Sequence, residues 1–134
     1  MGICSTTYGD LVCRGCKRFA HEIVQWNGYD ETQQQRIWSR LNQLRDEVVA
    51  QQVKIIDQPR FRALVEQAGL QNASSEEQIY EMLRRLVAES KPLSKAGLVG
   101  VGSEQLSIVA LRAIDAEIFT RSQAHYERNF KVLA

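Results

Sequence analysis

Residues 30–49, DETQQQRIWSRLNQLRDEVV, carry the clearest helical pattern in this chain of 134 residues. Asp30, followed three residues later by Gln33, is typical of a capping box, in which each side chain binds the other residue's backbone N–H. Apolar side chains then recur at helical spacing at Ile37, Leu41, Leu44 and Val48. The stretch therefore predicts a long amphipathic helix that buries one face.

Four further helices are predicted, over residues 19–26, 59–68, 74–87 and about 104–130. Asn27-Gly28 ends the first of them, and Gly69 ends the second. Ser74 and Glu77 form another capping box at the start of the third. The last stretch contains neither Gly nor Pro, so it predicts a long C-terminal helix.

Few stretches have the pattern of a strand, so the predicted fold class is all-α. We expect an N-terminal Cys-rich metal knuckle followed by a bundle of about five helices. Residues 1–52 would hold the knuckle and two helices, and residues 53–134 would form a helical extension packed on them as one compact unit. The glycine-rich stretch 93–102 is expected to be a buried loop or a single helical turn.

The composition excludes several classes of protein. Hydrophobic residues make up 44% and charged residues 25%, as in ordinary globular chains, so disorder and collagen are poor descriptions. The net charge of +1 gives no global attraction to nucleic acid or to anionic membranes. No apolar run approaches the length of a membrane span, and the N-terminus lacks the layout of a signal peptide. We therefore expect a cytoplasmic protein that does not enter a membrane.

All three cysteines, Cys4, Cys13 and Cys16, lie within the first 16 residues. Cys13-Arg14-Gly15-Cys16 is a C-x2-C turn, which lets two thiolates converge on one tetrahedral metal ion, and Cys4 could close back as a third ligand. A disulfide framework is the weaker interpretation, because such frameworks use even numbers of cysteines in secreted domains. A redox C-x-x-C pair is a further alternative, but it normally belongs to a mixed strand and helix setting.

A metal ion would need a fourth ligand. His21 gives the pattern C-x8-C-x2-C-x4-H and would complete a Cys3His zinc site. Solvent, the N-terminal amine or a partner's residue are the alternatives for that position. In the plainest interpretation, His21 is a solvated or core-edge histidine and the thiols are free.

The same residues resemble a known bacterial family. The run Cys4, Cys13-Arg14-Gly15-Cys16, Trp26-Asn27 and Asp30-Glu31, over about residues 1–46, is similar to the family called domain of unknown function 1289, whose members are often labelled YdhL-like predicted iron–sulfur proteins. Cys4, Cys13 and Cys16 match the family's second, third and fourth cysteines. The first has no counterpart here, and a longer native N-terminus would supply it.

The resemblance implies a thiolate-bound metal, and its label favours an iron–sulfur cluster. His21 stands where the family usually carries Asp or Glu, so its use as a ligand is not implied by the resemblance. Three thiolates with one imidazole suit zinc better than a cluster, which usually takes four sulfurs. We therefore favour zinc, with an iron–sulfur cluster or an empty site as alternatives.

Three classes of function are open. The sequence offers no catalytic constellation, since its two histidines lie over a hundred residues apart, and an enzyme is disfavoured. Arg14, Lys17 and Arg18 flank the thiolate pair and could contact RNA or DNA, although they would also offset the charge of a metal–thiolate centre. We prefer an accessory or interaction module that binds a protein partner or a second copy of itself.

Overall fold

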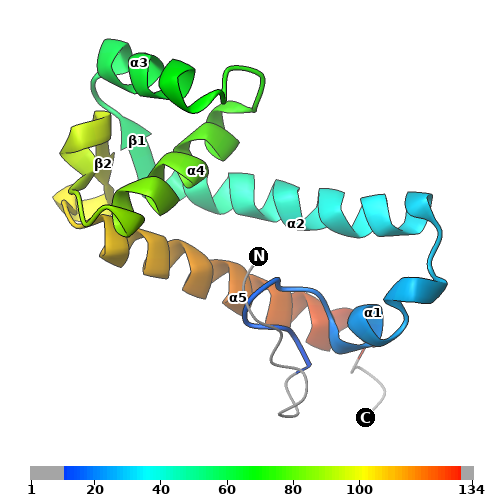
Figure 1. Ribbon diagram of the computed structural model, residues 1–134. Helices are drawn as coiled ribbons and strands as arrows, with labels where there is room; N and C mark the ends of the chain where they lie inside the picture. Colours follow the sequence, from blue (N-terminus) through cyan, green and yellow to red (C-terminus); the bar gives the residue numbers. More distant parts are fainter. Residues whose placement is uncertain (1–10, 131–134) are drawn as a thin grey trace. The chain divides into compact units, whose positions relative to one another are not determined.

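A computed structural model describes residues 11–130 (Figure 1). Over these residues the chain forms five α-helices and two short strands. In chain order they are α1 (Ala20–Val24), α2 (Glu31–Gln52), β1 (Val53–Ile55), α3 (Gln58–Ala68), α4 (Ser75–Ala88), β2 (Leu98–Gly100) and α5 (Ser107–Phe130). Short 3-10 turns cover η2 (Trp26–Gly28), η3 (Leu93–Ala96) and η4 (Val101–Ser103). The predicted mainly helical fold, with about five helices and a long C-terminal one, is confirmed.

The capping box predicted at Asp30 forms in both directions, and at Ser74 the N-cap bond of the predicted box forms. The Gln33 N–H donates to Asp30 Oδ1 over 2.7 Å, and the Asp30 N–H donates to Gln33 Oε1 over 2.9 Å. At α4, the Glu77 N–H donates to Ser74 Oγ over 3.2 Å. These bonds pair N–H groups that have no partner within the helix, and so they fix where α2 and α4 begin.

The prediction of an all-α fold was wrong in one respect, because β1 and β2 form a two-stranded antiparallel sheet (Figure 1). Val53 lies opposite Gly100 and Ile55 lies opposite Leu98. The side chains of Val53 and Leu98 are buried, which gives these short strands an apolar anchor. Each strand has only three residues, too few to show an alternating pattern in the sequence.

Gly97 allows the chain to turn into β2. Its φ of +70° lies in the left-handed region, and a Cβ at this position would stand 2.6 Å from the carbonyl oxygen of Asp57. The Gly97 carbonyl accepts N–H bonds from Ile56 and Asp57, at 2.8 and 3.1 Å. Only glycine combines this backbone conformation with such a close approach. The predicted single helical turn is present at the start of residues 93–102 as η3, and the chain then enters strand β2, which was not predicted.

The chain divides into two compact units. Unit 1 comprises residues 1–44 and 116–134, of which residues 11–44 and 116–130 are described, and unit 2 comprises residues 45–115. Each unit has its own buried apolar residues, among them Val12, Phe19, Leu41 and Ile118 in unit 1, and Val48, Leu83, Leu93, Leu98 and Ile114 in unit 2. The predicted boundary near residue 52 stays a prediction.

None of the helices within residues 11–130 is both long enough and apolar enough to cross a membrane.

Candidate metal centre

The C-x2-C sequence forms the tip of a small hairpin in unit 1. Val12 and Phe19 pair in an antiparallel bridge, and the Cys13 N–H donates to the Arg18 carbonyl over 2.8 Å. The Lys17 N–H donates back to the Cys13 carbonyl over 2.8 Å and closes the turn. This backbone pattern carries both cysteines on one short loop whose ends are fixed by the bridge.

Both described thiols are buried and reduced. Cys13 is 0% exposed and Cys16 is 3% exposed, and neither forms a disulfide. The Cys16 N–H lies 3.4 Å from Cys13 Sγ, and Arg18 Nε lies 3.2 Å from Cys16 Sγ, so each sulfur accepts a hydrogen bond. Both sulfurs thus have hydrogen-bond donors within the same short turn, as ligand atoms of metal sites commonly do.

Lys17 stabilises the turn through its backbone conformation and through hydrogen bonds from its side chain. It adopts a φ of +67°, which is unusual for a residue with a side chain, and it is only 7% exposed. Its Nζ donates to the carbonyl oxygens of Arg14 and, over 3.2 Å, of Gly15. The ammonium group therefore neutralises carbonyl dipoles of the turn, and little of it is open to solvent.

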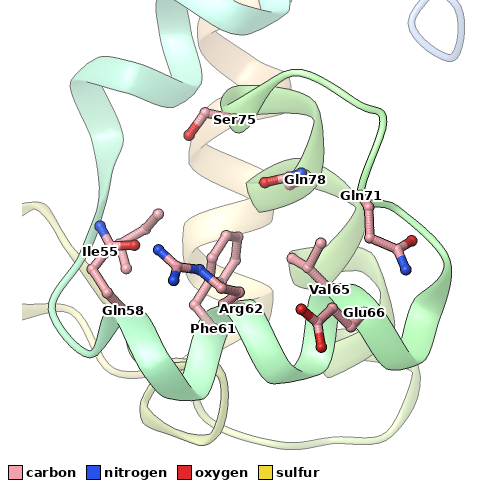
Figure 2. Close-up of a pocket in the computed structure, with 9 residues that line it drawn as sticks. All are labelled: Ile55, Gln58, Phe61, Arg62, Val65, Glu66, Gln71, Ser75 and Gln78. Carbon is pink, nitrogen blue, oxygen red and sulfur yellow. The ribbon is translucent and has the colours of Figure 1, made fainter.

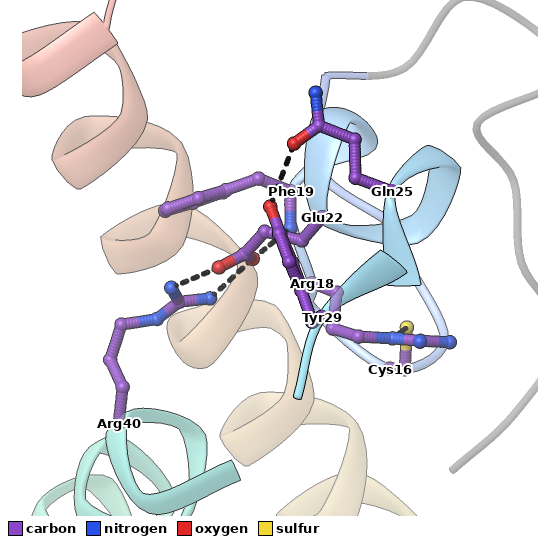
Figure 3. A network of polar contacts seen from close by, with 7 residues as sticks. All are labelled: Cys16, Arg18, Phe19, Glu22, Gln25, Tyr29 and Arg40. Atoms are coloured by element: carbon purple, nitrogen blue, oxygen red, sulfur yellow. Dashed lines mark hydrogen bonds and ion pairs between the residues drawn. The ribbon is translucent and has the colours of Figure 1, made fainter. Parts of the chain in front are cut away.

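Arg18 links the Cys16 sulfur to the two tryptophans of the chain. Its guanidinium carbon lies 4.7 Å from the Trp26 ring centroid and 5.3 Å from that of Trp38. The two indoles contact each other edge to face at 5.3 Å. Figure 3 shows Arg18 extended beside Cys16. These cation–π contacts hold the guanidinium in place next to the sulfur.

Arg14 is the third cation of the hairpin, and its guanidinium carbon lies 4.5 Å from the ring centroid of Phe119 on α5. Each of the three cationic side chains predicted as contacts for nucleic acid thus has a partner within unit 1. Their use in binding a partner stays a prediction.

An ion pair between Glu22 on α1 and Arg40 on α2 lies beside the hairpin (Figure 3). Arg40 donates from both terminal nitrogens to the two carboxylate oxygens of Glu22, at 2.6 and 2.8 Å, and the Phe19 N–H donates to Glu22 Oε1 over 2.7 Å. Burial alone would raise the pKa of Glu22, but the bonds from Arg40 and Phe19 and the charge of Arg40 outweigh it and hold the pKa below its usual value. The carboxylate is thus kept ionised.

Both histidines lie against Phe19, although a hundred residues separate them in sequence. The His21 and Phe19 ring centroids are 5.8 Å apart, and His125 stacks on Phe19 at 5.6 Å with an interplanar angle of 11°. Tyr126 completes the cluster, edge-on to Phe19 at 5.3 Å. Figure 1 shows α1, which contains His21, beside the C-terminal part of α5, which contains His125 and Tyr126.

The structure brings together only part of the predicted ligand set. Cys13 and Cys16 share one turn, whereas Cys4 lies outside the described residues. Within residues 11–130, no group of three or more His, Cys, Asp or Glu side chains is arranged to hold a metal ion. His21 has aromatic neighbours, and its role as a ligand stays a prediction.

Sequence reasoning missed the pairing of Glu22 with Arg40. Phe19 is the N-cap of α1, and Glu22 follows it by three residues. A glutamate at this position often accepts the N–H of the N-cap residue, so the sequence contained a local indication for Glu22. It contained none for Arg40, because its partner lies 18 residues away on another helix.

A separate cavity of about 370 Å³ lies in unit 2, between β1, α3 and α4 (Figure 2). Apolar side chains of Ile55, Phe61 and Val65 line it together with one positive side chain, Arg62, one negative side chain, Glu66, and several amide or hydroxyl groups. It holds no cysteine or histidine, and the positive and negative side chains balance. The cavity therefore offers no metal site and no marked preference for a charged ligand.

Comparison with known proteins identifies one family. Residues 1–45 match the model of the family described as "Protein of unknown function (DUF1289)". The match covers the hairpin, α1 and most of α2, and it confirms the resemblance found in the sequence. No curated protein and no solved structure matches the chain.

Proposed function

We propose that this chain is a helical accessory protein whose N-terminal hairpin binds a thiophilic metal ion through Cys13 and Cys16, with Cys4 as a third ligand. One observation carries the proposal, namely two buried, reduced cysteines on one turn, each with an N–H donor directed at its sulfur. Soft thiolates of this kind select zinc or iron–sulfur clusters over hard cations such as magnesium.

The surrounding charges support the same proposal. Three thiolates on a divalent ion leave a net negative charge, and Arg14, Lys17 and Arg18 all belong to the hairpin. Arg18 contacts one sulfur directly, and its indole neighbours hold it there. The chain's own residues would thus bind the ion, offset the negative charge of the metal–thiolate centre and exclude water from both sulfurs.

We favour zinc, with His21 as the fourth ligand, and keep an iron–sulfur cluster as the alternative. Zinc would crosslink the hairpin without redox chemistry, whereas a cluster would also carry single electrons. The helical units would then present a surface to a protein partner or to a second copy of the chain.

The experiment is metal analysis of the purified full chain, combined with its visible absorption spectrum. We expect about one zinc per chain and no colour. Bound iron with broad visible absorption would instead show that the site holds an iron–sulfur cluster. The double variant Cys13→Ser, Cys16→Ser should lose the metal and melt at a lower temperature. A chain that binds neither metal, or a double variant with unchanged melting, would contradict the proposal.

The two histidines provide a matched control for the fourth ligand. His21 and His125 both pack on Phe19, but only His21 belongs to the predicted ligand set. If His21 binds the ion, His21→Ala should weaken zinc binding much more than His125→Ala does. Equal effects of the two changes would assign His21 to aromatic packing alone.

Binding of RNA or DNA by Arg14, Lys17 and Arg18 is the second candidate function. It has less support, since Lys17 is buried and Arg18 packs against both indoles. Binding to a generic RNA pool that falls steeply with salt would support it, and absence of binding at low salt would remove it.

A further inference from the structure

A second groove in unit 2, of about 360 Å³, lies along the C-terminal parts of α3 and α4. We call it the basic groove. Its apolar lining comes from Leu64 and Ala68 on α3 and from Met82 and Leu86 on α4. Leucine and methionine side chains form an adaptable surface that suits a large apolar side chain of a ligand.

The rim of the basic groove is positively charged. Arg85, Lys91 and Lys95 line it, with Glu89 as its one acidic side chain. Glu89 pairs with Lys91, Oε2 to Nζ, at 3.0 Å. Within the described part of the chain, the charged groups of Arg85 and Lys95 have no acidic partner, so the rim offers two unpaired cations beside an apolar floor.

The dipole of α4 explains the position of only one of these three cations. Arg85 lies in the last turn of α4, where a cation is favoured by the negative end of the helix. Lys91 and Lys95 lie beyond the end of α4, so the same explanation does not extend to them. The cavity shown in Figure 2 makes a useful contrast, because its lining carries one positive and one negative side chain, whereas the basic groove has three positive side chains and one negative.

We propose that the basic groove binds an acidic amphipathic peptide segment of a protein partner. A large apolar side chain of that segment would lie on the floor between α3 and α4, and flanking Asp or Glu side chains would meet Arg85 and Lys95. The floor contains no aromatic ring for a base to stack on, which favours a peptide over single-stranded nucleic acid. This inference deepens the interaction part of the proposed function, because it names the chemistry of the partner.

The test uses the full chain and a phage-displayed library of random 16-residue peptides. Enriched peptides should carry large apolar residues flanked by Asp or Glu, and a fluorescein-labelled copy should bind saturably, more weakly as salt rises. The double variant Arg85→Glu, Lys95→Glu should weaken that peptide by about tenfold or more, because attraction at the rim becomes repulsion. Ala68→Leu should also weaken it by filling the floor.

Matched controls lie in the same unit. The double variant Lys54→Glu, Arg62→Glu makes the same change in charge away from the basic groove, and Ala63→Leu adds the same bulk on an exposed position of α3. Both should leave the affinity for the peptide within about twofold of the original, as distant surface changes usually do.

Three outcomes would overturn the proposal. They are enrichment of peptides without acidic residues, equal weakening by the control variants, and binding of an RNA pool or of phosphatidylglycerol vesicles that depends on Arg85 and Lys95 and displaces the peptide. Because all these variants lie in unit 2, such a result would leave metal binding by Cys13 and Cys16 to be judged on its own experiment.

Discussion

Replacing Glu22 with Gln removes the charge of the buried carboxylate that joins α1 to α2, while nearly preserving its shape. In the original chain this carboxylate accepts three hydrogen bonds of 2.6–2.8 Å, two of them from the Arg40 guanidinium. The amide of Gln can still accept the bond from Phe19. It presents an NH2 group to at least one nitrogen of Arg40, and two donors then face each other.

The expected cost follows from these contacts. A hydrogen bond to a charged group contributes about 1.5–3 kcal/mol to stability, and one of the two bonds from Arg40 is lost outright. The Arg40 side chain is 31% exposed, so water can replace part of the hydrogen bonding that it loses. We therefore expect Glu22→Gln to lower the free energy of unfolding by about 2 kcal/mol, below the cost of breaking a fully buried ion pair.

Urea unfolding followed by tryptophan fluorescence measures this cost, because both tryptophans lie in unit 1 with Glu22. Glu117→Gln is the matched control. Glu117 accepts one bond from Arg121 at 2.8 Å on the surface of α5, and its loss should cost no more than about 0.5 kcal/mol. A loss below 0.5 kcal/mol for Glu22→Gln, or one equal to the control's, would refute the reasoning.

The same variant predicts a dependence on pH. The pKa of Glu22 in the folded state lies below its usual value of 4.5, so the unfolded chain takes up this proton first as pH falls. The stabilisation is complete above pH 4.5 and is lost as pH falls through the lower pKa of the folded state. Below pH 4.5 the original chain should therefore lose stability more steeply than Glu22→Gln, and parallel curves would show that Glu22 contributes nothing.

Three further predictions concern unit 2. Ser90, at φ +55°, closes α4 in a left-handed conformation, and Ser90→Gly should raise the free energy of unfolding by about 1 kcal/mol in urea titrations. Gly97→Ala should lower it by about 2 kcal/mol or more, since a Cβ would meet the Asp57 carbonyl oxygen at 2.6 Å at a positive φ; a smaller loss would show that the corner can relax. Burial and the Asp115 carboxylate, 3.1 Å from the Tyr80 hydroxyl, raise the pKa of Tyr80 to about 12. Tyr80→Phe should thus leave the tyrosinate absorbance at about pH 11 nearly unchanged. A decrease equal to the absorbance of one fully ionised tyrosine would contradict that pKa.

Features that depend on neighbouring residues could be predicted from the sequence. The capping box at Asp30 and the N-cap bond at Ser74 join residues three apart, so the starts of α2 and α4 could be predicted without tertiary structure. Gly69 was likewise identifiable as the end of α3, because its left-handed conformation, at φ +73°, favours glycine. The mainly helical fold followed from such local patterns.

Features that depend on distant residues could not be predicted in this way. Strands β1 and β2 pair across more than forty residues, and neither is long enough to show a pattern of its own. The two histidines are over a hundred residues apart in the sequence, yet both lie against Phe19. The C-x2-C turn was predictable from spacing, whereas the packing of Arg18 against both indoles required the fold of unit 1.

The order of the units along the chain has a practical consequence. Unit 2 is inserted between two parts of unit 1, and the family match ends at residue 45, at the end of the first part. A fragment cut at that residue would keep the cysteine hairpin but lack the turn of α5 that supplies His125 and Tyr126 to Phe19. Domain borders drawn from the matched segment alone would separate unit 1 from its own C-terminal part, so truncation studies should retain residues 116–130 or join them to residue 44 by a short linker.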